Sequence, residues 1–292
     1  MKFLVLGAGG MAGHVVTIHL AERGHSVTAL SRNPFPWGAC QSIQGNIKDA
    51  SFLGGVLAAG CYDAVVNCVG VLNQDAERDR SLAVRLNSLL PHALEDMTRG
   101  TGTKVIQIST DCVFSGATGG YHEGAYRDGA AFYDRSKALG ELENDKDLTF
   151  RTSLVGPDVN PNGIGLFNWF MRQSGSIKGY SRAIWTGVTT DVLAQAVEQA
   201  VECGLTGLYH LVNAAPISKF DLLGLFNEHF RNGEVNITPE PSVSVDKSLV
   251  NNRRDFSFAV PSYREMVEGM KKWASAHAPL YPHYSLCGTE RE

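Results

Sequence analysis

Tyr133 and Lys137 form the first pair in the sequence whose types and spacing could do chemistry. A spacing of four residues places a phenol and an ammonium one above the other on the same face of a helix. A free tyrosine has a pKa of about 10, so it exchanges a proton efficiently at neutral pH only if a nearby cation favours the phenolate. Lys137 could supply that charge. The pair therefore predicts a proton-transfer site on a helix.

A hydroxyl group is expected close to this pair. Residues 105–111, Val-Ile-Gln-Ile-Ser-Thr-Asp, have the composition of a buried parallel strand that delivers Thr110 to its end. Open α/β proteins bind their ligands at the carboxyl edge of the sheet, so Thr110 could hydrogen-bond a substrate oxygen there. Asp111 and Cys112 follow directly and are expected among the substrate contacts at the same edge.

A glycine-rich turn follows the first expected strand and opens the first helix. Gly7, Gly10 and Gly13 have the spacing G-x-x-G-x-x-G. Such a turn needs glycines because the chain takes positive φ, approaches a pyrophosphate closely and packs the helix tightly on the strand. The helix N-terminus then presents free N–H groups to the anion, which predicts a dinucleotide cofactor. Its expected contacts here are Gly7, Gly10, Met11 and Ala12.

The end of the second expected strand bears on the choice between NAD and NADP. An enzyme selective for NAD usually places an Asp or Glu there, on the 2′-hydroxyl of the adenosine ribose. This chain instead has Ser31 and Arg32, which could bind a 2′-phosphate, so NADP(H) is favoured and NAD(H) stays an alternative. Position in the fold adds five expected cofactor contacts: Asn46 and Ile47 after the third strand, and Cys68, Val69 and Gly70 after the fourth.

Three stretches of the sequence resemble the extended short-chain dehydrogenase/reductase family. They are residues 109–116 (STDCVFSG), 133–141 (YDRSKALGE) and 151–153 (RTS). Within that family they look most like the dTDP-4-dehydrorhamnose reductases, and the similarity runs from Met1 to about Trp273. The resemblance implies reduction by NAD(P)H of the C4 ketone of a nucleotide-linked 4-keto-6-deoxy sugar, a step of polysaccharide biosynthesis.

The same resemblance implies a role for each chemical group. Tyr133 would donate the proton. Lys137 would lower the pKa of Tyr133 and hold the nicotinamide ribose, so both residues are also expected to contact the cofactor. Thr110 would polarise the ketone. Asn87 matches an Asn-containing helix of the family and would position Lys137 or contact the substrate.

The residues expected to contact the substrate match the family pattern less closely. Cys112 stands where these reductases usually carry a tyrosine that touches the sugar, so the hexose could differ, for example by bearing an N-acetyl group. Residues 164–171 and 183–190 are expected to form the sugar and nucleotide pocket. Phe167 and Trp185 are the candidate substrate contacts in these stretches, although both suit a hydrophobic core equally well.

Two alternatives stay open on this fold. Nucleotide-sugar dehydratases, and epimerases related to them, share it, and dehydratases usually carry Asp-Glu after the catalytic Thr because loss of water needs an acid and a base at adjacent carbons. Here the pair is Asp111 and Cys112, and a thiol substitutes poorly for the second acid. The other alternative is a non-catalytic, NADP-binding regulatory subunit, because fold alone does not decide function.

A doubly wound parallel sheet is needed to hold these groups. Short apolar runs alternate with longer amphipathic stretches, which is typical of βαβ units in a Rossmann α/β fold. The expected strands are residues 3–6, 26–30, 64–69, 104–109, 148–152 and 207–212, and the expected helices are residues 11–23, 51–59, 81–98, 132–143, 190–201, 218–230 and 262–276. The expected division is a Rossmann domain at 1–155, a smaller substrate lobe at 156–276 with parts returning to that domain, and a C-terminal tail at 277–292.

Composition and charge limit the partners. The chain has 292 residues and a formal charge of −4 without a Lys/Arg cluster, so long nucleic acid is not an expected partner. No segment approaches about 18 uninterrupted apolar residues, so no membrane span is expected. Its 6 cysteines lie far apart without a C-x-x-C, which favours reduced thiols in the cytoplasm over a disulfide frame or a zinc site. No metal ligands are predicted, and a homodimer stays open.

Overall fold

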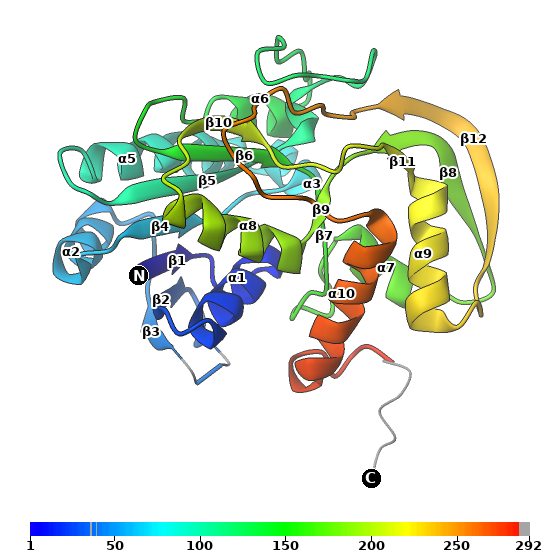
Figure 1. The fold of residues 1–292 in the computed structure, drawn as a ribbon, viewed down its shortest axis with the longest axis horizontal. Coiled ribbons are helices and arrows are strands. Elements are labelled where there is room, and N and C mark those ends of the chain that lie inside the picture. Colours follow the sequence, from blue (N-terminus) through cyan, green and yellow to red (C-terminus); the bar gives the residue numbers. More distant parts are fainter. Residues whose placement is uncertain (36, 39, 286–292) are drawn as a thin grey trace.

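A seven-stranded parallel sheet forms the centre of the protein (Figure 1). The computed structural model describes residues 1–35, 37–38 and 40–285. The strand order is β10-β6-β5-β4-β1-β2-β3, so the chain starts in the middle and winds outward in both directions, which confirms the doubly wound Rossmann fold. The strands are β1 (Lys2–Leu6), β2 (Ser26–Ser31), β3 (Gln41–Gln44), β4 (Ala64–Asn67), β5 (Lys104–Thr110), β6 (Leu148–Thr152) and β10 (Gly207–His210).

Helices cover both faces of this sheet. Phe3 and Val5 of β1 share one core with α1 and α8, whereas Leu4 and Leu6 share the other core with α2 and α5. Because both faces of the strands are buried, β1 is a continuous apolar run and not an alternating one. The helices are α1 (Met11–Glu22), α2 (Ala50–Gly60), α5 (Leu90–Met97) and α8 (Thr190–Glu202).

The helix expected over residues 81–98 is not continuous. It consists of α4 (Arg80–Ala83), a π-helical turn (Val84–Leu89) and α5, and it is preceded by the short α3 (Asn73–Arg78). A π-helical turn carries one residue more than the α-helical turn and is frequent at functional sites. Asn87, one of the predicted site residues, lies inside this turn.

The helix expected over residues 132–143 is shorter than predicted. It ends as α6 (Phe132–Ala138). At Gly140 the chain passes so close to the π-helical turn that a Cβ would stand 1.9 Å from the backbone oxygen of Asn87. The chain therefore leaves the helix, and Glu141 becomes a buried residue.

A smaller lobe stands beside the main sheet, at the right of Figure 1. Its three-stranded sheet has the order β11-β8-β12 and is covered by α9, which packs closely on Gly179 of β8. Strands β8 and β12 were not predicted, because most of their residues are exposed or half-exposed and give no apolar pattern. The lobe contains α7 (Leu166–Met171), β8 (Ser176–Trp185), β11 (Ile217–Ser218), α9 (Lys219–Arg231) and β12 (Asn236–Asp246), and the pair β7 (Leu154–Val155) and β9 (Val188–Thr189) leads into it.

The chain returns to the main domain after this lobe. Helix α10 (Tyr263–Ala276) is followed by a 3₁₀ turn (Ala278–Leu280). His277, Tyr281 and Tyr284 are all buried, and the two tyrosines belong to the same core as α1. The segment expected as a C-terminal tail from residue 277 is thus packed up to its last described residues, and residues 286–292 lie outside the described part.

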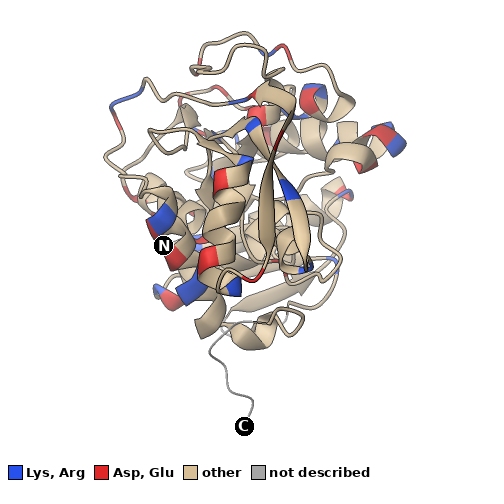
Figure 2. Ribbon diagram, turned by 90° about the vertical axis from the view of Figure 1, so that its right-hand side faces the viewer, with Lys and Arg blue, Asp and Glu red and all other residues tan. Residues whose placement is uncertain are grey.

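The surface gives two further observations. Among the described residues, no helix combines the length and the apolar character needed to cross a membrane. Along α9, β8 and β12, the positions of positive and negative residues are interspersed on the ribbon (Figure 2).

Candidate active site

The structure brings the three predicted catalytic residues together at the carboxyl edge of the sheet. Thr110 is the last residue of β5, and Tyr133 and Lys137 lie one turn apart on α6. All three are buried. The Thr110 hydroxyl donates to Asp111 Oδ1 at 3.1 Å, accepts from the Cys112 backbone N–H at 3.1 Å and hydrogen-bonds the phenol of Tyr133. The hydroxyl and the phenol can therefore act on one substrate oxygen.

Burial, more than charge, sets the protonation of Tyr133. It raises the pKa of the phenol well above its ordinary value, and the hydrogen bond with Thr110 only partly opposes this. Lys137 is not the dominant influence expected from the sequence, because its Nζ donates to the backbone oxygen of Ile108 at 2.7 Å. The phenol accordingly holds its proton at neutral pH, as a general acid must.

Lys137 carries a labile charge. Burial lowers its pKa to about 8, and the nearby carboxylate of Glu141 opposes that shift. An ordinary lysine has a pKa of about 10.4. Lys137 is thus close to its titration range at neutral pH, and its charge responds to small changes around it.

Asp111 and Cys112 also face this edge. Burial raises the pKa of the Asp111 carboxyl, and the positive charge of Lys247 is the largest opposing influence. Burial raises the pKa of the Cys112 thiol to about 12, with the Asp111 charge as the next cause. The thiol therefore stays protonated and is a poor nucleophile.

Two lysines of the smaller lobe complete the edge and were missed by the sequence analysis. Lys247 follows β12 and Lys219 begins α9, and the charges of both act on buried Asp111. Within the described part of the chain, neither ammonium makes an ion pair or a side-chain hydrogen bond. Isolated lysines in polar stretches carry no sequence signal, because the pairing of β12 and β11 with β8 places Lys247 and Lys219.

Asn87 is fully buried and holds two segments together. Its Oδ1 accepts from the Val71 N–H at 2.8 Å, and its Nδ2 donates to the Val71 oxygen at 2.9 Å and to Ser136 Oγ at 3.0 Å. Ser136 precedes Lys137 on α6. Asn87 therefore links the segment at Val71 to α6, and both hydrogens of its amide are donated to protein partners.

The glycine turn has the geometry that a pyrophosphate site requires. Gly7 has φ +74° and packs against the Cys68 backbone and the Val69 side chain. A Cβ at Gly13 would stand 2.1 Å from the Gly7 oxygen, so only glycine lets the helix approach the strand this closely. Gly10 is the N-cap of α1, and Met11 and Ala12 form its first turn, whose N–H groups point out of the helix end.

The other predicted cofactor contacts lie around this turn. Ser31 is buried at the end of β2 and donates to the Asn33 oxygen at 2.5 Å, whereas Arg32 is exposed. Asn46 is exposed, and Ile47 is partly buried against the α2 side of the core. The remaining three, Cys68, Val69 and Gly70, follow β4 at the carboxyl edge, and burial raises the pKa of the Cys68 thiol to about 12.

Phe167 and Trp185 take core positions. Phe167 is fully buried and packs its ring on Phe226 and Phe230, so it has no surface to offer a substrate. Trp185 is buried as well, and its Nε1 donates to Ser153 Oγ at 2.7 Å. For Phe167 the structure thus selects the core role over the predicted substrate contact, because the lobe needs large side chains to fill its interior.

A second buried polar cluster lies beside the catalytic one. Arg151 donates through Nε and Nη2 to the two carboxylate oxygens of Glu141 at 2.9 and 2.7 Å, and through Nη1 to His210 Nε2 at 2.7 Å. Ser109 donates to Glu141 Oε1 at 2.6 Å. Burial and the Arg151 charge lower the pKa of His210 to about 3, so the neutral imidazole accepts from Arg151 and donates to the Val250 oxygen.

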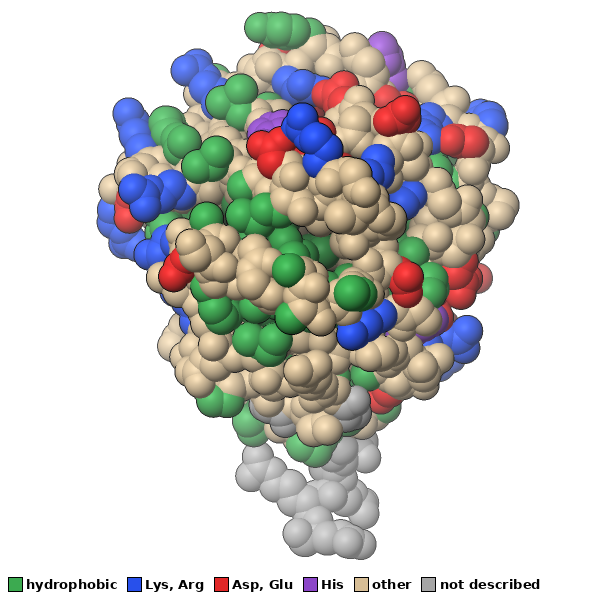
Figure 3. Space-filling view, turned by 90° about the vertical axis from the view of Figure 1, so that its left-hand side faces the viewer, with side chains coloured by type: hydrophobic (Ala, Val, Ile, Leu, Met, Phe, Trp, Pro, Cys, Tyr) green, Lys and Arg blue, Asp and Glu red, His purple; other side chains and the backbone are tan. Residues whose placement is uncertain are grey.

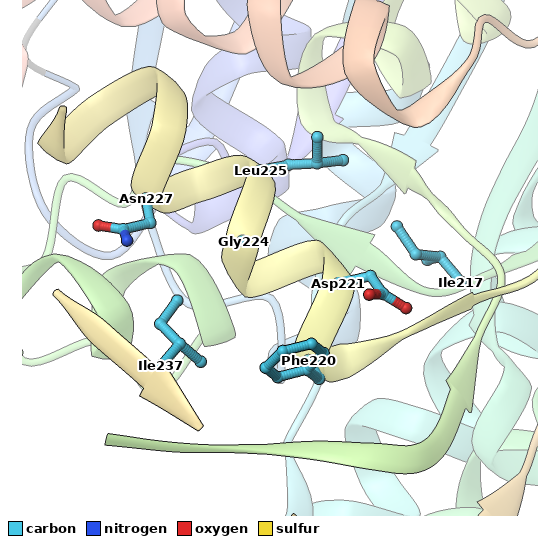
Figure 4. Close-up of a pocket in the computed structure, with 7 residues that line it drawn as sticks. All are labelled: Ile217, Phe220, Asp221, Gly224, Leu225, Asn227 and Ile237. Atoms are coloured by element: carbon cyan, nitrogen blue, oxygen red, sulfur yellow. The ribbon is translucent and has the colours of Figure 1, made fainter. Parts of the chain in front are cut away.

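Other concave or ligand-rich places lie away from this edge. One groove lies between α9 and β12, lined by apolar side chains such as Phe220, Leu225 and Ile237 (Figure 4). Another lies between α2 and the strands near it, on a face where apolar side chains gather (Figure 3). A group of potential metal ligands, His25, Glu198 and Glu202, lies between the α1–β2 connection and α8, but Arg23 already pairs with Glu198. None of these places includes a predicted site residue.

Sequence comparisons agree with this arrangement. The family described as the RmlD substrate binding domain matches residues 1–253. A dTDP-4-dehydrorhamnose reductase of Mycobacterium tuberculosis is 31% identical over 231 residues, which cover 75% of this chain and 72% of that protein. A dTDP-4-dehydrorhamnose reductase of Streptomyces griseus is 27% identical over 98% of this chain and 94% of its own.

Solved structures share the fold. A dTDP-4-dehydrorhamnose reductase of Bacillus anthracis in complex with NADP superposes with a TM-score of 0.78 at 21% identity, covering 92% of this chain and 98% of that one. A UDP-glucose 4-epimerase of Thermotoga maritima with UDP-glucose gives the same TM-score at 17% identity, over 95% of this chain and all of that one. At these identities the likeness establishes the architecture, which reductases and epimerases have in common.

Proposed function

The chain belongs to the RmlD substrate binding domain family, and we propose on this basis that it reduces the C4 ketone of a nucleotide-linked 4-keto-6-deoxy sugar with NADPH. The observation that carries the proposal is the set Thr110, Tyr133 and Lys137, buried together at the carboxyl edge of the sheet. Its relatives in sequence are named reductases. The chain is accordingly an NAD(P)-dependent oxidoreductase of the short-chain dehydrogenase/reductase type.

The residues of this chain provide the proton and the alignment for the reaction. When bound, NADPH supplies the hydride. Tyr133 holds a proton that burial keeps on the phenol and gives it to the oxygen formed from the ketone. Thr110 turns its hydroxyl hydrogen from Asp111 to the same oxygen and so stabilises the charge that develops on it. Lys137 stabilises the phenolate that Tyr133 leaves behind.

The residues present fit a dinucleotide. The close approach of Gly13 to the Gly7 oxygen leaves a cradle that any Cβ would fill, and the first turn of α1 supplies the N–H groups for a pyrophosphate. Exposed Arg32, together with Ser31, suits the 2′-phosphate of NADPH. The complex of the Bacillus anthracis reductase with NADP supports this preference.

We assign the diphosphate of the substrate to Lys219 and Lys247. Burial raises the pKa of Asp111 and the positive charges of both lysines oppose this rise, so both act electrostatically on this edge. A nucleotide sugar brings two phosphate charges to this edge, and Lys is well suited to such an anion as a mobile point charge. The sugar would then lie between these lysines and Tyr133, close to Cys112.

The alternatives are less well supported. For a dehydratase, Cys112 would have to act as an acid beside Thr110 and Asp111, but a thiol with a pKa of about 12 gives up its proton poorly at neutral pH. A regulatory subunit would need no catalytic groups, yet Thr110, Tyr133 and Lys137 are intact and assembled. An epimerase has the same fold, so the experiment below is needed to distinguish it from a reductase.

The deciding experiment supplies NADPH and a dTDP-linked 4-keto-6-deoxy hexose and follows both cofactor oxidation and the sugar product. Stoichiometric NADPH oxidation with a new 4-hydroxyl group supports the reductase. Interconversion of sugars without net oxidation indicates an epimerase, and NADPH binding without turnover on any 4-keto sugar indicates a regulatory subunit. UDP-linked and N-acetylated ketones extend the same assay to the base and to the C2 substituent.

Three broader expectations stay proposals. We propose a cytoplasmic setting, supported by free thiols at Cys40, Cys61, Cys68, Cys112 and Cys203. A homodimer and the division into a Rossmann domain at 1–155 and a substrate lobe at 156–276, with parts returning to that domain, are proposed on the sequence alone. Size measurements in solution and limited proteolysis test these two.

A further inference from the structure

The segment after α10 brings two buried tyrosines back to the nucleotide-binding half of the molecule. Tyr281 and Tyr284 are the two ends of one turn, since the Tyr284 N–H donates to the Tyr281 oxygen at 3.0 Å and their rings stack. The family match ends at residue 253, so it assigns nothing to them. Their hydroxyl groups contact different parts of the molecule.

Tyr281 reaches the pyrophosphate turn through His14. Its hydroxyl lies 2.6 Å from His14 Nε2, and His14 Nδ1 lies 2.8 Å from the oxygen of Gly10, the N-cap of α1. A carbonyl oxygen can only accept, so Nδ1 carries the hydrogen and Nε2 accepts from Tyr281. Trp273 Nε1 donates to the tyrosine oxygen at 3.0 Å, which fixes the direction of the whole chain of hydrogen bonds.

The central bond of this chain, between His14 and Tyr281, is buried and uncharged. His14 has no exposed surface, and Tyr281 is only 1% exposed. Burial lowers the pKa of His14 to about 4, so the imidazole is neutral at neutral pH. A neutral imidazole has one donor and one acceptor, and here both are used. The Gly10 oxygen therefore receives the His14 side chain in addition to the helical N–H of the same residue.

Tyr284 holds the loop that follows β7. Its hydroxyl donates to Asn168 Oδ1 at 2.9 Å and accepts from the Asp158 N–H at 3.0 Å. Asn168 is fully buried on α7, and its Nδ2 donates to the Gly163 oxygen at 2.7 Å. The loop between Asp158 and Gly163 is thus fastened from inside by one tyrosine and one asparagine.

The two fastened parts meet at the N-terminus of α1. A Cβ at Gly165, the residue before α7, would stand 3.1 Å from the Sδ of Met11. Met11 is the first residue of α1, next to Gly10. The loop end therefore lies directly against the helix N-terminus that faces the cofactor phosphates.

We propose that Tyr281 and Tyr284 are positioning residues, which fix two segments beside the active site through hydrogen bonds on the side away from the ligands. Tyr281 holds the pyrophosphate turn through His14, and Tyr284 holds the loop at residues 158–165 through Asn168. The arm concerning Tyr284 rests on the proposed function, because it concerns a nucleotide-sugar substrate. The arm concerning Tyr281 needs only cofactor binding.

The test uses the full chain and measures the NADPH dissociation constant and the KM of the sugar separately. Tyr281→Phe leaves the His14 acceptor unpaired, and we expect the NADPH dissociation constant to rise about fivefold to tenfold, as for one lost buried hydrogen bond. Tyr284→Phe should leave that constant within about twofold and raise the KM of the sugar by a similar factor, with kcat reduced less than kcat/KM. Tyr263→Phe is the matched control, since its buried hydroxyl donates to the Ala215 oxygen at 2.7 Å.

A second variant keeps the test valid if Tyr281→Phe folds poorly. His14→Asn retains a donor near Gly10 but is too short to reach Tyr281, so it should reproduce the loss of NADPH affinity. The proposal is overturned if these variants only lower the melting temperature, as Tyr263→Phe does, and leave the NADPH constant and the sugar KM unchanged. If the wild type turns over no sugar, the proposed function fails. The NADPH dissociation constants of the variants still decide the role of Tyr281.

Discussion

Two buried polar clusters lie side by side at the carboxyl edge of this sheet, and they differ in how completely their groups are paired. In the cluster of Glu141, Arg151 and His210, the guanidinium is fully buried and donates to both carboxylate oxygens and to the imidazole. In the catalytic cluster, the Thr110 hydroxyl is paired with Asp111, the Cys112 N–H and Tyr133, whereas the Tyr133 phenol has no hydrogen-bond partner among the described residues other than Thr110.

The difference in pairing suggests that one cluster stabilises the fold and that the other acts on a ligand. A buried charge with all its hydrogen bonds satisfied contributes to a unique fold, whereas groups with spare hydrogen-bonding capacity are available to a ligand. Lys137 stands at the boundary, since its ammonium donates to the Ile108 oxygen and is also influenced by Glu141. The contrast predicts that substitutions in one cluster affect the rate and substitutions in the other affect stability.

The largest expected effect is on the rate. Tyr133→Phe removes the proton donor but keeps the ring and its packing, so kcat should fall by about 10²–10⁴-fold. The NADPH dissociation constant and the melting temperature should change little. A Tyr133→Phe protein that keeps more than about a third of wild-type kcat would contradict the general-acid role, and steady-state kinetics with direct cofactor titration decide this.

The opposite result is expected for the paired cluster. Arg151→Met removes the bidentate partner of buried Glu141, which keeps only Ser109 and the pair with Arg127, so the free energy of unfolding should fall by up to about 3–5 kcal/mol. Chemical denaturation measures the loss. Arg264→Met, which breaks the exposed pair with Glu228, is the control and should cost no more than about 1 kcal/mol. Equal losses in the two variants would mean that the buried cluster has no special part in stability.

The residue at the boundary should give a pH effect. The folded pKa of Lys137 lies near 8, below the ordinary value, so the ammonium is present below about pH 8 and lost above it. If the reaction needs this charge, kcat/KM should fall about tenfold per pH unit above 8, and the fall should be absent from the residual activity of Lys137→Met. A profile that stays flat up to the ordinary lysine pKa of about 10.4 would show that Lys137 is not titrating as its burial implies.

A smaller effect is expected at Lys247, which we assign to the substrate diphosphate. Lys247→Ala removes a charge-assisted contact with the substrate diphosphate, so the KM of the nucleotide sugar should rise about tenfold while the NADPH constant stays the same. Lys178→Ala is the control, because Lys178 pairs with Glu240 on the sheet of the same lobe. If both variants raise KM equally, the effect belongs to the net charge of the lobe and not to Lys247.

The smallest effect is expected at exposed Arg32. Arg32→Ala should reduce the ratio of kcat/KM for NADPH over NADH by about threefold to tenfold, because an exposed charge-assisted bond to the 2′-phosphate is lost. Arg23→Ala, at the far end of α1, should leave the ratio unchanged. A wild-type protein that prefers NADH would overturn the assignment of Ser31 and Arg32.

The main sheet and the predicted catalytic groups could be read from the sequence because their signals are local. Strands such as β1 and β5 are buried on both faces, so their apolar runs stand out. The spacing of Tyr133 and Lys137 acquires meaning on a helix, and α6 is helical over both residues. Properties of one segment were therefore sufficient for this half of the site.

The rest depends on contacts between distant segments. Strands β8 and β12 are separated by about 60 residues and have largely exposed side chains, so neither strand nor the placement of Lys247 could be predicted. The split of the helix over residues 81–98 follows from the fit of Asn87 against Ser136 and Val71. Phe167 illustrates the same limit, since an apolar segment looks alike whether it lines a pocket or fills a core.

The contact between His14 and Tyr281 has a consequence for how the protein is made. Its two residues are 267 positions apart in sequence, and a ribosome releases the first long before the second. The strands and helices of the N-terminal half can pair as they emerge, because their contacts are closer in sequence. The turn that meets the cofactor phosphates is therefore synthesised long before it gains all its hydrogen bonds, and under our proposal a nascent chain reaches its full NADPH affinity only after Tyr281 has emerged and packed on His14.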